Sequence, residues 1–71
     1  MDVDTARRTF PHGTRVRVVA GPLAGQTGAV VGIDVEVAEQ VGEAVLTIDV
    51  GADFDESVAP SEVEIIGPPS A

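Results

Sequence analysis

Apolar and polar residues alternate early in the chain, starting at residue 14. Over residues 14–19, two valines alternate with Arg15 and Arg17. This period of two predicts a strand with one buried and one exposed face. A glycine-rich run over residues 21–28 follows, and Pro22 presets a turn dihedral within it. The pattern predicts two strands joined by a compact turn.

The second strand is predicted to begin near Gly28 and to run to Val37. Its alternation slips where Val30 and Val31 stand together before Gly32. A glycine inside a strand, next to such a slip, predicts a bulge or a sharp bend. A bend of this kind lets one strand serve two sides of a small barrel.

Three further short strands are expected in the second half of the chain. The pattern places them at residues 44–50, 58–59 and 63–66, after a polar loop at 38–43 and an acidic turn at 51–57. A single 3-10 turn is predicted at 60–62, directly before the last strand. The fold class is therefore all-β, a small five-stranded barrel whose closure removes exposed strand edges.

The chain is predicted to hold one domain, at residues 13–66. Residues 1–12 are expected to form a flexible N-terminal arm, and residues 67–71 a disordered tail. A helical turn at residues 4–8, with Asp4 as its cap, is too short to persist alone.

Composition agrees with a small sheet. The chain has 71 residues and no cysteine, and its hydrophobic share of 44% is mostly valine, alanine and isoleucine. The two aromatic residues, Phe10 and Phe54, are expected to cap the core or to anchor a loop. No apolar stretch is long enough for a membrane span, and the N-terminus lacks a signal-peptide layout. We therefore expect a cytoplasmic protein with no membrane partner.

The net charge of −8 narrows the choice of partners. Twelve acidic residues face four arginines and no lysine, and every arginine precedes residue 18. Binding to nucleic acid depends on clustered cations that release counterions, so the overall charge disfavours it. The acidic surface is either solubilising or itself functional, and the sequence leaves both interpretations open.

Residues 14–34 resemble the KOW motif, in which alternating hydrophobic residues precede a glycine-centred turn and a second apolar strand. The runs at 46–50 and 58–65 are similar to the way SH3-like barrels of that family finish, so the resemblance covers residues 13–66. It implies a KOW-type SH3-like barrel that binds RNA, ribosomal proteins or polymerase partners, with the first turn in the contact surface. The chain departs from the family by carrying Leu23 where an aromatic is frequent, and by being acidic and free of lysine. These departures argue against direct nucleic-acid binding.

The remaining groups of polar residues and glycines predict neither catalysis nor ligand binding. The glycine spacing of the turn leads into a strand, without the Lys-Ser/Thr pair of a phosphate-binding loop. The acids Asp49, Asp53, Asp55 and Glu56 lack the pattern of a calcium loop and are interpreted as a solvated turn. His12 has no obvious pocket in so small a barrel. We expect no catalytic residue, no metal and no cofactor.

Arg15 and Arg17 have two interpretations. They form ion pairs with Asp34 and Glu36 across the sheet, which we favour, or they form a patch for phosphate or for an acidic partner.

The leading hypothesis is a non-enzymatic interaction module that docks on a protein of the transcription or translation machinery. Its partner-binding residues are predicted to be Arg15, Arg17, Gly21, Pro22, Leu23 and Gly25. The alternatives are RNA or DNA binding through the arginine patch, and a structural accessory subunit of a larger complex. The oligomeric state stays open.

Overall fold

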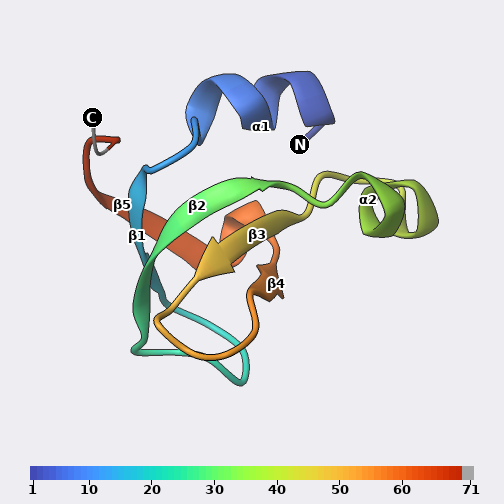
Figure 1. Cartoon of the computed structure of the whole chain (residues 1–71). Coiled ribbons are helices and arrows are strands. Elements are labelled where there is room, and N and C mark those ends of the chain that lie inside the picture. Colours follow the sequence, from blue (N-terminus) through green and yellow to red (C-terminus); the bar gives the residue numbers. More distant parts are fainter. Residues whose placement is uncertain (70–71) are drawn as a thin grey trace.

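The computed structural model describes residues 1–69 and contains one strongly bent antiparallel sheet with two short helices (Figure 1). The strands are β1 (Arg15–Val18), β2 (Thr27–Ile33), β3 (Leu46–Asp49), β4 (Glu56–Val58) and β5 (Val63–Gly67), in the sheet order β4-β3-β2-β1-β5. A single 3-10 turn, η1 (Pro60–Glu62), precedes β5. The prediction of a five-stranded, SH3-like all-β fold with a 3-10 turn before the last strand is confirmed.

Strand β1 follows its sequence pattern closely. Val16 and Val18 are buried, and the arginines between and before them are exposed. The strand pairs with β2 on one side, where Val16 lies opposite Gly28, and with β5 on the other. The alternation of two valines with two arginines therefore fixes which face of β1 covers the core.

The predicted bend in β2 is confirmed. The register between β2 and β3 shifts between Val30 and Gly32, so Val31 is the extra residue of a bulge and is exposed. The first half of β2 pairs with β1 and the second half with β3. One bent strand thus joins the two sides of the barrel.

The prediction that the second strand continues to Val37 is wrong, because helix α2 (Val35–Val41) follows Asp34 directly. The Asp34 carboxylate accepts a hydrogen bond of 3.2 Å from the Val37 N–H and caps the helix. Gly42 ends it in the left-handed region, at a φ of 80°. Most of the predicted polar loop at 38–43 is therefore helical.

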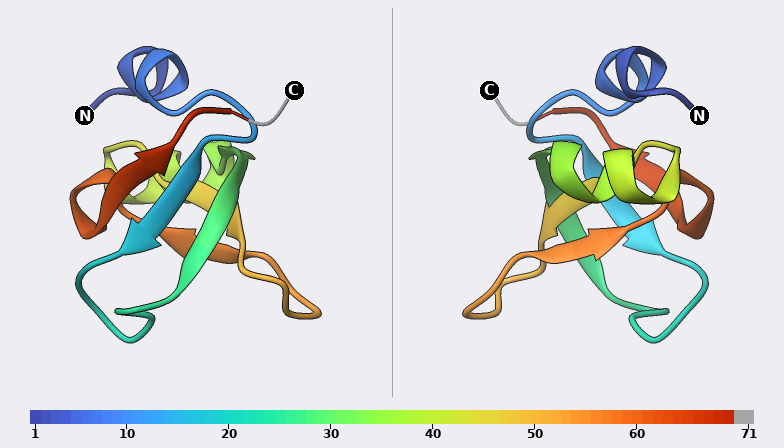
Figure 2. Two further views of the ribbon diagram at one scale, coloured as in Figure 1. Left: turned by 90° about the vertical axis from the view of Figure 1, so that its left-hand side faces the viewer. Right: turned by 90° about the vertical axis from the view of Figure 1, so that its right-hand side faces the viewer.

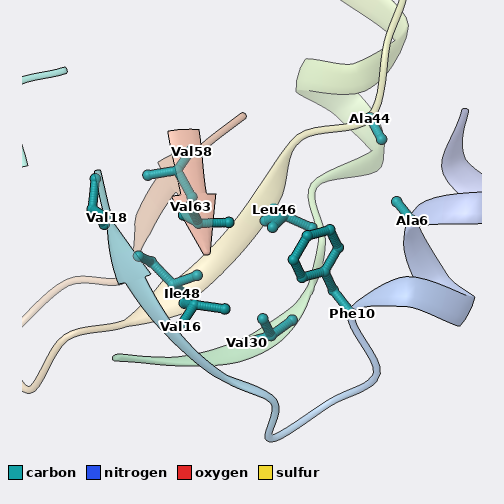
Figure 3. Close-up of a cluster of buried hydrophobic side chains, with 10 residues drawn as sticks. All are labelled: Ala6, Phe10, Val16, Val18, Val30, Ala44, Leu46, Ile48, Val58 and Val63. Atoms are coloured by element: carbon teal, nitrogen blue, oxygen red, sulfur yellow. The ribbon is translucent and has the colours of Figure 1, made fainter. Parts of the chain in front are cut away.

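The N-terminal segment, where the sequence predicts a loose arm, contains helix α1 (Val3–Thr9), with Asp2 rather than Asp4 at its N-cap. Ala6 is fully buried, and the ring of Phe10 points into the barrel (Figure 3). The Ala44 N–H also donates to the Met1 carbonyl at 2.9 Å. Because a seven-residue helix is unstable alone, this packing explains how α1 forms.

The later strands differ from their predicted limits by a few residues. Strand β3 is shorter than predicted, β4 begins earlier, and β5 includes Gly67, the first residue of the predicted tail. Residues 70 and 71 of that tail lie outside the described residues.

One cluster forms the core, drawn from α1 and all five strands (Figure 3). Its members are Ala6, Phe10, Val16, Val18, Val30, Ala44, Leu46, Ile48, Val58 and Val63. Helix α1 covers one end of the barrel, and the loops at 19–26 and 50–55 lie at the opposite end (Figures 1 and 2). Within residues 1–69, no helix has the length and apolar character needed to cross a bilayer.

Candidate functional site

The turn between β1 and β2 is held by its own backbone. The Gly25 N–H donates to the Val18 carbonyl at 2.8 Å, and the Val18 N–H donates to the Gln26 carbonyl at 2.8 Å. Inside the turn, the Ala24 N–H donates to the Gly21 carbonyl at 3.2 Å. A loop with this many internal hydrogen bonds is pre-organised, so a partner orders little of it on binding.

The turn is also tied to η1 through Glu62. The Val19 N–H donates to the Glu62 carbonyl at 2.7 Å, and Glu62 Oε1 accepts the Ala59 N–H at 2.9 Å. Gly21, at a φ of 82°, lies against the same carboxylate. Glu62 therefore joins two segments that are some forty positions apart in the chain.

Leu23 lies in the turn between β1 and β2, as one of the predicted partner-binding residues. It is half-buried and packs against the core cluster, whereas Pro22 beside it is exposed. Both residues border a cavity of about 210 Å³ between the turn, β4 and η1. The cavity is lined by Ala20, Pro22, Leu23, Glu56, Ser57, Val58 and Glu62.

This cavity has apolar walls and two carboxylates. Glu56 and Glu62 are both partly buried, and none of the lining residues is basic. Sequence reasoning missed both glutamates, assigning Glu56 to a solvated acidic turn and Glu62 to a helical turn. No local signal groups them, because only the return of β4 and η1 to the first turn brings them together.

The predicted ion pairs of the arginines with Asp34 and Glu36 are wrong. Arg17 Nη1 instead lies 2.8 Å from Glu64 Oε1 on β5, and both side chains are half exposed. Among residues 1–69 this is the one ion pair. The reason is the strand register, which places Arg15 and Arg17 opposite Ala29 and Thr27, so Asp34 and Glu36 lie beyond the part of β2 that pairs with β1. The Asp34 carboxylate instead caps α2.

The two predicted site arginines lie on the exposed face of β1, directly before the turn. Arg17 already has an acidic partner, and Arg15 lies opposite Gly67 of β5. The structure therefore places Arg15, Arg17, Gly21, Pro22, Leu23 and Gly25 on one continuous strand and turn, of which only Pro22 and Leu23 border the cavity.

A larger and more open groove, of about 520 Å³, lies between α1 and α2. Its lining includes the apolar residues Val3, Val35 and Ala38 together with Arg7 and acidic residues. None of the predicted site residues contributes to it. Its mixed charge does not favour one kind of ligand.

The acidic loop between β3 and β4 holds itself together locally. Asp49 Oδ1 accepts the Gly51 N–H at 2.8 Å. Across residues 1–69, no group of three or more His, Cys, Asp or Glu side chains is arranged to hold a metal ion. Both phenylalanines were expected to cap the core or to anchor a loop. Phe54 does not cap the core, because it is 80% exposed in this loop, whereas Phe10 is buried in the core cluster.

Fold and site together define a small SH3-like barrel with a rigid surface turn. A sequence model of the family described as KOW motif matches residues 12–48, which is just over half of the chain, and the chain belongs to this family. The match spans β1, the turn, β2, α2 and most of β3. The KOW motif is a non-catalytic module that interacts with proteins or RNA in ribosomal and transcription proteins. A search of curated proteins and a search of solved structures each found no match.

Proposed function

We propose that this protein is a non-enzymatic interaction module that docks on a protein partner through the turn at Gly21–Gly25 and the adjacent surface of β1. The observation that carries the proposal is the position of Pro22 and Leu23. A pre-organised turn presents both at the edge of a surface cavity, within the segment that matches the KOW motif. A turn that is already ordered loses little conformational entropy on binding, and this favours it as a docking surface.

Charge favours a protein over a nucleic acid as the partner. The chain carries a net charge of −8, and Arg17, one of the two arginines of the predicted patch, is paired with Glu64. A cation that is already paired releases fewer counterions from a phosphate backbone. Membership of the KOW family supports a partner from the transcription or translation machinery and, with it, a cytoplasmic location.

The proposal is tested by capture on the immobilised full chain from native lysate, followed by identification of the bound proteins. Pro22→Arg is the informative variant, because Pro22 is exposed and borders the cavity, so a bulky cation there opposes docking without disturbing the core. Val41→Arg is the matched control, since Val41 is exposed on α2 and the charge change is the same.

We expect the same protein to be captured by the wild type and by Val41→Arg, and to be lost with Pro22→Arg. Capture by Pro22→Arg at wild-type level overturns the proposed site. Capture that disappears after ribonuclease treatment overturns the protein partner in favour of RNA.

A further inference from the structure

We propose that the cavity beside the turn, which contains Pro22, Leu23, Glu56 and Glu62, receives one arginine side chain of the docked protein. This inference rests on the proposed function, because it names the chemistry of the partner at the same site. It is carried by the size, lining and charge of the cavity.

The volume suits a single side chain. Pockets that hold drug-sized molecules and cofactors measure about 300–1,000 Å³. At about 210 Å³ the cavity is smaller than these. It lies at the edge of the turn, where a side chain enters from a docked surface.

The lining suits a side chain with an aliphatic stem and a charged end. Pro22, Leu23 and Val58 supply apolar surface, and Glu56 and Glu62 supply the carboxylates. An arginine side chain combines both features, because three methylene groups precede its charged guanidinium. Its five N–H donors also let it bind two separate carboxylates together, which a neutral or acidic side chain cannot do.

The carboxylates of the cavity have no cation of their own. No arginine or lysine follows Arg17 in the sequence, and within the described residues the single ion pair involves Glu64, which lies outside the cavity. Glu62 is also fixed in place, because its Oε1 accepts the Ala59 N–H. A fixed carboxylate loses little conformational entropy when a cation binds it.

The test is a titration of the isotope-labelled full chain with N-acetyl-L-arginine amide at low ionic strength, followed by NMR. The neutral isostere N-acetyl-L-citrulline amide is titrated in parallel. We expect the arginine probe to give saturable shifts confined to the turn, β4 and η1, and the citrulline probe to bind more weakly. Glu56→Gln and Glu62→Gln should each lower the affinity for the arginine probe about fivefold, as expected for a partly exposed ion pair.

Both glutamine variants keep a side-chain oxygen that accepts a hydrogen bond, so the Ala59 contact of residue 62 is retained. Asp53→Asn is the control, because it removes the same charge from the exposed β3–β4 loop outside the cavity. It should leave the affinity within about twofold of the wild type, since screened, distant charges contribute little.

Equal binding of the two probes overturns the inference. So do unsaturable shifts spread over the acidic surface, or an equal loss of affinity with Asp53→Asn. The inference also fails, with the docking function intact, if Glu56→Gln still captures a protein that Pro22→Arg no longer captures. Conversely, if the arginine probe binds in the cavity but Pro22→Arg captures the protein at wild-type level, the proposed function fails and the arginine site stands.

Discussion

Gly21 and Glu62 approach so closely that a Cβ atom on Gly21 would lie 2.6 Å from Glu62 Oε2. The same carboxylate accepts the Ala59 N–H through its other oxygen, so it is not free to swing away. Gly21 is therefore required twice, for its φ of 82° and for the space that it leaves to Glu62.

Replacing Gly21 by alanine should destabilise the protein in two ways. The left-handed backbone costs about 1–2 kcal/mol with a Cβ present. Displacing Glu62 then breaks its hydrogen bond to Ala59, for about 1 kcal/mol more. Gly25→Ala is the control, since Gly25 has a φ of 95° but nothing lies within 4 Å of its added Cβ. Urea unfolding of both variants measures the difference, and equal losses would show that Glu62 gives way freely.

Gly28 is a second glycine with a steric role, at the point where β2 approaches β3. A Cβ there would lie 2.5 Å from the backbone carbonyl oxygen of Asp49, which cannot rotate away. We expect Gly28→Ala to lower the free energy of unfolding by about 3 kcal/mol, the upper range for overpacking.

Gly32→Ala provides the comparison on the same strand. No heavy atom lies within 4 Å of a Cβ added there, and its φ is not in the left-handed region. It should therefore change stability by less than about 1 kcal/mol, with any gain arising from a less flexible unfolded chain. Chemical denaturation of the two variants measures their free energies of unfolding. A Gly28→Ala protein as stable as the wild type would contradict the close approach of β2 and β3.

The two phenylalanines should respond very differently to truncation. Phe10 is 6% exposed and belongs to the core cluster, so Phe10→Ala should cost about 3–5 kcal/mol. For a domain this small, that loss is most of its stability. Phe54→Ala removes a ring that is 80% exposed and should change stability by about 0.5 kcal/mol or less. Thermal unfolding followed by circular dichroism compares them, and a mild effect of Phe10→Ala would mean that α1 is not part of the folded unit.

Phe10 and Phe54 also show what the sequence can and cannot predict. Both rings stand in polar surroundings in the chain, and only the path of the backbone separates a core residue from an exposed one. The strands were predictable where one face is buried, as in β1, because a period of two is local. The bulge near Gly32 was predictable for the same reason, since it interrupts that period.

Helix α2 was missed, and α1 was expected only as a helical turn at residues 4–8 that would not persist, because the interactions that stabilise these helices are caps and distant contacts. Helix α1 depends on burying Ala6 against residues far along the chain. Helix α2 begins in a run whose valines alternate with acids, and this alternation predicts a strand. The candidate site, too, was predicted only in part. Its turn could be predicted from glycine and proline, whereas Glu56 and Glu62 join the site only because β4 and η1 return to the turn between β1 and β2.

Asp34 decides between the strand that its neighbours favour and the helix that forms. Its Oδ1 accepts the Val37 N–H at 3.2 Å, satisfying a donor that the first helical turn leaves open. Asp34→Ala should therefore lower the free energy of unfolding by about 1 kcal/mol, whereas Asp34→Asn, which keeps a capping oxygen, should be nearly neutral. Hydrogen exchange of the α2 amides measures the local effect. Faster exchange in Asp34→Ala alone supports the cap, because a purely electrostatic role of the carboxylate would make both variants lose protection equally.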